Sequence, residues 1–385
     1  MVEAFEVFLS YESQRLIWWG LMGVLLIGFA VTDGFDLGVG ALLPWIAHTD
    51  AERRVVINVI GPTWEGNQVW FILGGGAIFA AWPLVYAAAF SGLFIALILL
   101  LFALILRPVG FKYRSLMADP RWRATWDWAL FVGGVVPALL FGVAFGNLFV
   151  GLPFHFDADL RVFYTGSFWG LLQPFALLAG LVSLAMLVMH GAIYLQLRTA
   201  DTLQARARRA AQLAALVLVI GFGSAGLVVA TLPGYGIASF PGVDAPSNPL
   251  LKEVDLEVGG WLANYARYPW MLVAPMAGLT GALLTGLLAT LNRPGWGFIT
   301  SATAVAGVIL TAGFSLFPFI MPSSSVPNSS LTLWDATSSQ HTLQWMTFVT
   351  AFFMPLILLY TAWVYRVLRG TITLETIRRG AKSLY

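Results

Sequence analysis

Residues 61–70 read GPTWEGNQVW, and they lie inside a run that is otherwise almost wholly apolar, from Val55 to Leu106. The stretch places a glutamate, an asparagine and a glutamine where the surrounding sequence predicts a membrane core. A charged acid at the centre of a membrane span costs about 2.5–3.5 kcal/mol on insertion scales. The fold therefore has to compensate these polar side chains.

The whole chain is more apolar than a soluble protein. Of its 385 residues, 59% are hydrophobic and 10% are charged, against about 45–50% and about 25% in soluble domains. Roughly 20 apolar residues cross a bilayer as a helix, and charge-free stretches of that length recur along the chain. The composition predicts an all-α polytopic membrane protein, with 1–385 as a single transmembrane domain because no linker or repeat divides it.

Turn-forming residues such as Pro83, Pro153 and Pro233 divide the apolar stretches into nine spans. We expect these spans near 17–46, 55–80, 85–106, 126–150, 167–197, 210–232, 270–291, 297–321 and 343–365.

The basic residues divide unequally between the two sides that nine spans define. Of the 21 Lys and Arg residues, only Arg15, Arg161, Lys252 and Arg267 fall on one side, so the split is 17 against 4. Cytoplasmic loops carry the excess of Lys and Arg, so the sequence predicts an N-terminus outside and a cytoplasmic C-terminus. These basic residues have a topological role and do not indicate binding of nucleic acid.

The chain offers few ligands for a metal or a haem. It has no cysteine and four histidines, of which only His190 falls within an expected span. One histidine does not complete a site, so we favour a packing or interfacial role for it and predict no metal centre in this chain.

Three acids lie within the expected spans: Asp33 and Asp36 in the first and Glu65 in the second, with no Lys or Arg expected at their depth. The short connection between the spans makes them an antiparallel hairpin. Asp36 and Glu65 each lie ten residues from its cytoplasmic end, or roughly 15 Å at about 1.5 Å per residue. We therefore expect the three carboxylates to meet near the middle of the bilayer.

Glycines accompany the two aspartates. Gly34, Gly38 and Gly40 would let a neighbouring helix approach closely, and the second span is the expected neighbour. Asp33 and Asp36 are three positions apart and share one helical face.

A polar seam surrounds Glu65 in the second span. Asn58 and Gln68 lie seven residues before and three residues after Glu65, hence on the same helical face, and Asn67 adds a further amide. Pro62 has no amide hydrogen, so the carbonyl group of Asn58 loses its usual helical partner.

Two readings of the acids are open. As a proton relay, they take up protons from the cytoplasm and release them; as a structural device, they stay protonated or hydrogen-bonded and hold the helices together. Trp64 and Trp70, which flank the polar seam, would either wall a path for a quinone or a gas or simply pack between helices.

Five blocks of the sequence resemble a known family, subunit II of the cytochrome bd-type quinol oxidases. They are VTDGFDLGVGALLPW (31–45), GPTWEGNQVWFILGGGAIFAAWPLVYAAAFSG (61–92), RPVGFKYRS (107–115), GVAFGNL (142–148) and MPSSSVPNSSLTLWDATSSQHTL (321–343). The blocks run along almost the entire chain in the order of the family. Glu65, where many members carry aspartate, is similar to the cyanide-insensitive branch.

The resemblance implies a heterodimer with subunit I in the bacterial inner membrane, each subunit having nine helices arranged as two four-helix bundles plus one peripheral helix. In that family subunit I carries the haems, of b and d type, and oxidises quinol, and the protons for reducing oxygen to water come from the cytoplasm. Subunit II lacks haem ligands, so no cofactor is expected to bind this chain through ligands of its own. A quinone occupies subunit II structurally in some members, lipid surrounds it, and a small single-helix subunit often attaches.

The resemblance also implies roles for single residues. Glu65 matches the acid of the W-[DE]-G-N-Q-V-W block, which is associated with proton delivery toward the haems, and Asp33 and Asp36 match the acids of D-G-F-D-L-G-V-G. The composition alone leaves two other functions open: a proton-coupled secondary transporter and a scaffold subunit whose acids only lock helices together.

Overall fold

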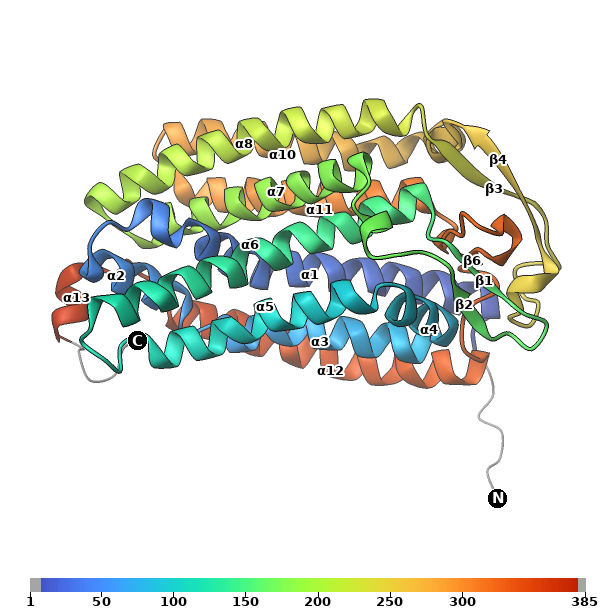
Figure 1. The fold of residues 1–385 in the computed structure, drawn as a ribbon, viewed down its shortest axis with the longest axis horizontal. Helices are drawn as coiled ribbons and strands as arrows, with labels where there is room; N and C mark the ends of the chain where they lie inside the picture. The colour runs from blue at the N-terminus through green and yellow to red at the C-terminus, as the bar shows by residue number, and fades with distance from the viewer. Residues whose placement is uncertain (1–7, 380–385) are drawn as a thin grey trace, which may run out of the picture.

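The computed structural model describes residues 8–379, which form a bundle of long helices with short strands at one end. Figure 1 shows the helices running along the long axis, with three hairpins at the right and the short α2 and α13 at the left. Within the described residues, eight helices are long and apolar enough to cross a membrane. The prediction of a mostly helical polytopic membrane protein is confirmed.

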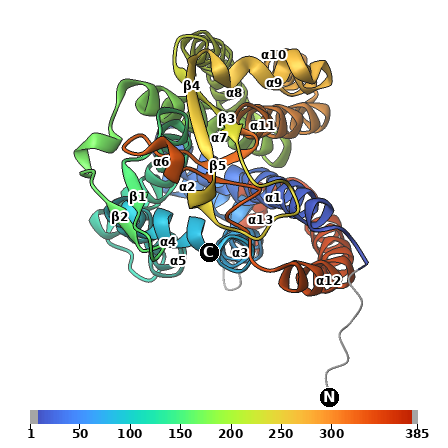
Figure 2. The ribbon, with the colours of Figure 1, turned by 90° about the vertical axis from the view of Figure 1, so that its right-hand side faces the viewer.

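The eight helices are α1 (Tyr11–Ile46), α5 (Phe94–Tyr113), α6 (Pro120–Val150), α7 (Pro174–Arg198), α8 (Asp201–Val229), α10 (Val273–Thr290, with the turn that precedes it), α11 (Pro294–Leu316) and α12 (Gln340–Val367). Viewed from the hairpin end in Figure 2, α7, α8, α10 and α11 gather on one side of the molecule and α12 lies at its edge. Two short helices, α9 (Ala263–Arg267) and α13 (Leu374–Arg379), complete the chain with the elements described next.

Two of the expected spans are interrupted. The span expected at 55–80 is the short helix α2 (Asp50–Ile60) followed by α3 (Trp64–Ala81), with a turn at 61–63. Pro62 lies in that turn, and its missing N–H and fixed backbone angle disfavour a continuous helix. The span expected at 85–106 is likewise α4 (Pro83–Gly92) followed by α5, which meet at Leu93.

Other boundaries shift for local reasons. Helix α7 begins at Pro174 and not at 167, because proline is favoured in the first turn of a helix. Helix α11 ends at Leu316, so the expected span to residue 321 was too long. Pro318 follows that end and cannot continue the helix.

Three two-stranded antiparallel sheets cover the right-hand end in Figure 1, and the sequence analysis did not predict them. They pair β1 (Phe154–Phe156) with β2 (Val162–Tyr164), β3 (Pro233–Ser239) with β4 (Glu253–Val258), and β5 (Phe319–Met321) with β6 (Leu331–Thr332). A buried ion pair joins the second and third of these sheets. Lys252 lies just before β4 and Asp335 just after β6, and Nζ of Lys252 is 3.0 Å from the Asp335 carboxylate. Burial lowers the pKa of Lys252, and Asp335 opposes that shift.

The three glycines near Asp33 and Asp36, namely Gly34, Gly38 and Gly40, pack against helices other than the expected one. A Cβ atom on Gly38 would strike the carbonyl group of Leu187 in α7, and one on Gly191 would lie 2.6 Å from the backbone nitrogen of Val39. Gly40 faces α6, where a Cβ atom would lie 3.1 Å from the carbonyl oxygen of Leu130. The close neighbours of α1 at Gly34, Gly38 and Gly40 are therefore α7 and α6, and the expectation of the second span was wrong for these three glycines.

We predict that Gly38→Ala destabilises the bundle by about 1–3 kcal/mol, because the added methyl group meets backbone atoms that cannot move without separating α1 from α7. Thermal unfolding of the detergent-solubilised protein measures the effect. Gly23→Ala on the same helix is the control, since a Cβ atom there has nothing within 4 Å. Equal unfolding temperatures for the two variants would contradict the proposed close crossing.

Candidate functional site

A buried ion pair joins α1 to α5. Arg107 binds Asp33 through both ends of its guanidinium group, with Nη1 2.9 Å from Oδ2 and Nη2 2.6 Å from Oδ1. The two side chains are 3% and 0% exposed. The expectation that no basic residue lies at the depth of the acids was therefore wrong: α5 continues through Pro108 to Tyr113, so Arg107 belongs to the helix and not to a loop.

A glycine in α6 makes room for this arginine. A Cβ atom on Gly133 would lie 2.9 Å from Cγ of Arg107. The stem of Arg107 thus packs against bare backbone while its charged end reaches Asp33. A two-point contact between a guanidinium and a carboxylate is among the strongest hydrogen-bonded pairs in proteins.

Asp36 lies on the other side of this pair and joins three helices. Its Oδ2 accepts a hydrogen bond of 2.7 Å from Nδ2 of Asn67 in α3, and Oδ1 of Asn67 accepts one of 2.6 Å from the hydroxyl group of Tyr365 in α12. Asp36 and Asn67 are buried. The second oxygen of Asp36, Oδ1, is also buried and has no partner in the described protein.

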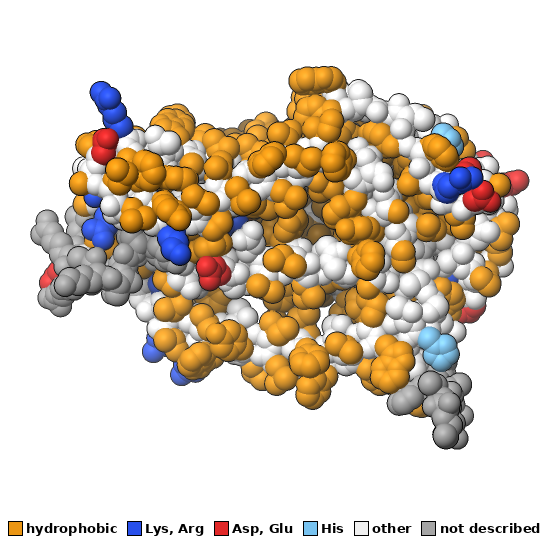
Figure 3. Space-filling view, turned by 60° about the horizontal axis from the view of Figure 1, so that its bottom comes forward, with side chains coloured by type: hydrophobic (Ala, Val, Ile, Leu, Met, Phe, Trp, Pro, Cys, Tyr) orange, Lys and Arg blue, Asp and Glu red, His pale blue; other side chains and the backbone are white. Residues whose placement is uncertain are grey.

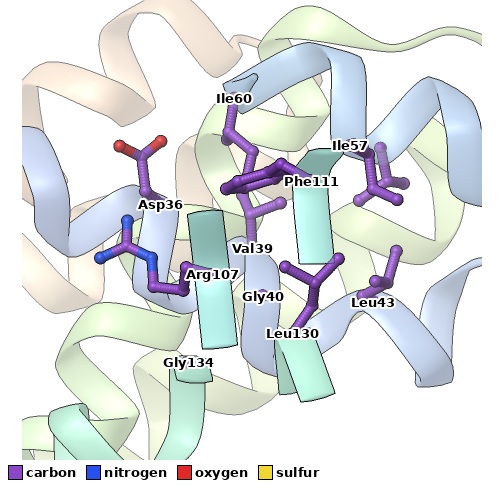
Figure 4. A pocket seen from close by; sticks show the side chains of 11 residues that line it. Asp36, Val39, Gly40, Leu43, Ile57, Ile60, Arg107, Phe111, Leu130 and Gly134 are labelled. Atoms are coloured by element: carbon purple, nitrogen blue, oxygen red, sulfur yellow. The ribbon is translucent and has the colours of Figure 1, made fainter. Parts of the chain in front are cut away.

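A small cavity adjoins Asp36 and Arg107. Figure 4 shows the carboxylate and the guanidinium group side by side at one end of it, with Phe111 and Leu130 farther along. It leaves about 10 Å³ for the centre of a water molecule, which is room for about one water. Asp36 and Arg107 are the polar residues of its lining, so a water there could bind to the Asp36 carboxylate.

Glu65 lies apart from the two aspartates. It is exposed in the first turn of α3, and among the described residues no hydrogen bond or ion pair joins it to Asp33 or Asp36. The expectation that the three carboxylates meet was wrong, because the turn at 61–63 interrupts the helix and changes which side chains face inward. The side chain of Thr63, the residue before α3, accepts no hydrogen bond from the helix. The backbone N–H groups in the first turn, where Glu65 lies, therefore lack a side-chain cap.

The predicted polar seam is divided by the same turn. Asn58 is buried in α2, where its Nδ2 donates to the carbonyl oxygen of Arg54 at 2.8 Å, whereas Gln68 is half-buried in α3. Trp64 stacks on Phe111 with ring centroids 5.2 Å apart. The ring of Trp70 fills the space above Gly28, where a Cβ atom would lie 2.7 Å from it.

His190 is buried, and both of its ring nitrogens have protein partners. Nδ1 lies 2.7 Å from the hydroxyl group of Ser301, and Nε2 lies 2.9 Å from the carbonyl oxygen of Val31. Within residues 8–379 no group of three or more His, Cys, Asp and Glu side chains is arranged to hold a metal ion. The geometry gives His190 a packing role between α1, α7 and α11.

Sequence reasoning missed an ion-pair cluster at the left end of the bundle. Asp127 in α6 is buried between Arg114, whose Nη2 lies 3.2 Å from Oδ2, and Arg53, whose Nη1 lies 2.8 Å from the same oxygen. Glu52 at the start of α2 belongs to the same end. Burial acts to raise its pKa, but the backbone N–H groups of His48 and Thr49 and the Arg206 side chain bring the pKa below its usual value.

A second, much larger cavity lies among α1, α6, α7, α8, α10 and α11. Its volume is about 590 Å³, and most of its lining is aromatic and aliphatic, including Phe29, Phe141 and Met186. Tyr265 and Ser315 supply a polar end, where the Tyr265 hydroxyl donates to the carbonyl oxygen of Thr311 at 3.1 Å. Cavities of this size and composition accommodate apolar organic ligands.

The fold and these contacts define a polytopic helical membrane protein built around a buried acid–arginine layer. The family model for cytochrome bd terminal oxidase subunit II matches residues 14–368. The chain is 53% identical to the cytochrome bd-I ubiquinol oxidase subunit 2 of Escherichia coli K12 over 98% of its own length and 100% of the relative. It is 51% identical to a probable cytochrome oxidase subunit 2 of Haemophilus influenzae, over 98% and 100% of the two lengths.

This chain belongs to the family of cytochrome bd terminal oxidase subunit II. It is a subunit of a membrane-bound respiratory oxidoreductase, as the sequence analysis predicted, and nothing supports a transporter. The bd oxidase of Geobacillus thermodenitrificans has the same fold, with a TM-score of 0.68 at 15% identity over 92% of this chain and 99% of that one. The similarity to the cyanide-insensitive branch stays a prediction.

We predict that Asp33→Ala destabilises the protein by about 3–5 kcal/mol, because it leaves Arg107 buried without a counter-charge. The double variant Asp33→Ala/Arg107→Met should lose much less than the sum of the two single losses, as a double-mutant cycle on chemical unfolding would measure. Arg123→Ala breaks the half-exposed pair with Asp50 and serves as the control, with an expected cost of about 1 kcal/mol or less. Additive losses at positions 33 and 107 would show that the two charges do not depend on each other.

Proposed function

We propose that this chain is the non-haem subunit of a quinol:oxygen oxidoreductase, that it assembles with a haem-bearing subunit I, and that it delivers protons from the cytoplasm along a pathway built from Asp33, Asp36 and Glu65. The observation that carries the proposal is the contrast between two neighbouring carboxylates. Asp33 is held at both oxygens by Arg107, whereas Asp36 keeps one buried oxygen free beside a cavity with room for one water.

The contrast assigns different roles to the residues of the layer. Asp33 and Arg107 form a fixed ion pair that holds charge at this depth. Asp36 is the group that exchanges a proton, through its free oxygen and a water in the adjoining cavity. Asn67 and Tyr365 hold the other oxygen of Asp36 in place. The proposed pathway therefore includes, besides the three acids, the residues Arg107, Asn67 and Tyr365. Asn58 and Gln68 are polar groups at its margin.

Glu65 is proposed as the point at which protons leave this chain. It is exposed on α3, and the exposed Gly66 and Gly76 lie on the same side of the helix, where a Cβ atom would have nothing within 4 Å. Small residues on a membrane helix allow another helix to approach closely, so we propose this face as the docking surface for subunit I. The haems of that subunit supply the reduction of oxygen to water, and the residues described here hold and move protons.

The proposed topology has nine crossings, with α2 and α3 together as the one that apolarity alone does not reveal. We place the N-terminus outside and the C-terminus in the cytoplasm. Figure 3 supports this orientation: most Lys and Arg side chains on the face in view lie at the left end of an apolar band.

We further propose that the helices form two four-helix bundles within the single domain 1–385. The first consists of α1, α3, α5 and α6, the second of α7, α8, α10 and α11, and α12 is the peripheral helix. The small single-helix subunit stays a prediction.

The large apolar cavity is proposed as the site of a structural quinone. Its aromatic walls suit an isoprenoid tail, and the hydroxyl groups of Tyr265 and Ser315 at one end suit the carbonyl oxygens of a quinone ring. Trp64 and Trp70 do not line this cavity, which supports a packing role for both.

We predict that Glu65→Gln and Asp36→Asn leave assembly and haem content of the complex intact while quinol oxidation and proton uptake fall by at least tenfold. Both substitutions keep the shape of the side chain, and the amide oxygen that replaces a carboxylate oxygen of Asp36 can still accept from Asn67, but neither new amide can exchange a proton. Proton uptake and oxygen consumption by the reconstituted complex measure the loss. Glu257→Gln in the exposed strand β4 is the control. If the assembled Glu65 and Asp36 variants oxidise quinol at the wild-type rate, the acids do not carry protons and have only a structural role.

We predict that Gly226→Leu lowers the quinone content of the purified complex, because Gly226 lines the large cavity and a Cβ atom there has nothing within 4 Å, so a larger side chain can take up space in it. Extraction and chromatography measure the quinone bound per complex, and oxygen consumption should change less than quinone content. Gly20→Leu on α1 adds the same side chain at an open position outside the cavity and should leave the quinone in place. Unchanged quinone content in the Gly226 variant would place the quinone elsewhere.

A further inference from the structure

A third cavity opens near the left end of the bundle, between the ends of α7 and α12 and the turn that separates α2 from α3. Its volume is about 180 Å³. Arg198 and Arg369 line it together with Thr63, Tyr194 and Tyr365. Arg198 is the last residue of α7, and Arg369 lies just beyond the end of α12. The cavity is therefore at the level where helices leave the membrane.

The charge of this cavity is not balanced by the described part of the chain. Among residues 8–379, no ion pair to Arg198 or Arg369 is formed, although other arginines at the same end, such as Arg53, Arg114 and Arg206, each pair with an acid. The Nε atom of Arg198 is buried and makes no hydrogen bond. Its guanidinium group lies 5.9 Å from the centre of the Tyr194 ring, which holds it beside the cavity. Two arginines without acids, one with a buried unused donor, fit an anion.

The remaining walls are apolar. Val59, Leu197, Phe298 and Leu368 line the inner side. On the face of α12 that carries Tyr365 and Arg369, an exposed apolar surface continues from the cavity along Ala362 and Leu358. A soluble anion would leave these surfaces uncovered, whereas a phospholipid places its phosphate between the arginines and its acyl chains along the helix.

We propose that this cavity binds the phosphate group of an anionic phospholipid from the membrane leaflet on the basic side of the protein. The phosphate accepts hydrogen bonds from Arg198 and Arg369, and the hydroxyl groups of Thr63 and Tyr194 lie within the same lining. Basic pockets between membrane helices at the cytoplasmic surface are typical sites for such headgroups. The site shares Tyr365 with the network around Asp36, but the proposal does not depend on the proposed proton pathway.

Binding of phosphatidylglycerol to the intact oxidase complex in detergent tests this proposal, with native mass spectrometry as the readout. The double variant Arg198→Gln/Arg369→Gln should bind the lipid about tenfold more weakly, since each basic residue near a membrane surface contributes to the attraction of anionic headgroups. Arg209→Gln/Arg366→Gln removes the same charge from two exposed arginines at the same end that do not line the cavity, and its affinity should stay within about twofold.

Two further arms identify the occupant. Phosphatidylcholine should bind the wild-type complex and the Arg198→Gln/Arg369→Gln complex equally weakly. Inorganic phosphate should not displace phosphatidylglycerol from the wild-type complex. If inorganic phosphate displaces phosphatidylglycerol from the wild-type complex, the site binds a soluble anion and the assignment to a phospholipid is overturned. Equal loss of lipid in the two double variants would reduce the effect to general surface charge and overturn the site. If the double variant fails to assemble, Arg369→Gln alone, which changes an exposed residue beyond the end of α12, should still weaken binding about threefold.

Discussion

The structure depends on one constraint: a charge placed among apolar helices must have a partner within reach. Asp33 meets this constraint through Arg107, and the contact fixes how α1 lies against α5. Gly133 in α6 must stay small for the arginine to fit, so the same pair also determines how close α6 comes. Asn67 and Tyr365 then bring α3 and α12 to the same layer through Asp36. Four helices are thus positioned by polar contacts, and α6 by its packing on the arginine, in a region where apolar packing alone gives little preference for one arrangement over another.

The sequence predicted the class of fold and the residues of the polar layer on α1, because charge-free stretches and isolated acids are properties of the chain itself. It did not reveal the partner of Asp33. The expected third span was ended at its first charged residue, so Arg107 was counted among the cytoplasmic loops, although the helix continues to Tyr113. The signal that would have found it is electrostatic: three intramembrane acids with no cation leave an unbalanced site, and Arg107 is the basic residue next to an apolar run.

The position of Glu65 was predicted wrongly for a geometric reason. Helical spacing predicts shared faces only while the helix is continuous, and the turn at 61–63 breaks that continuity between Asn58 and Glu65. Pro62 was recognised as freeing a carbonyl group, but its effect on direction depends on the packing of α2 and α3 against the rest of the bundle. The glycines of α1 show the same limit. Their spacing predicts close approach by some helix, whereas the choice of α7 and α6 comes from residues such as Leu187 and Leu130 that lie far along the chain.

In the proposed proton pathway, the arrangement of two aspartates around one arginine would let a buried site change charge without becoming unstable. When both acids are ionised, the layer of Asp33, Asp36 and Arg107 carries one negative charge in total. One proton on Asp36 makes the layer neutral, and the Asp33–Arg107 pair is undisturbed. A second proton, on Asp33, would leave Arg107 without a counter-charge among apolar helices, which is strongly unfavourable. In the proposed pathway, the ion pair would therefore limit the layer to a single exchangeable proton and direct that proton to Asp36, which lines the cavity for one water and whose Oδ1 has no protein partner.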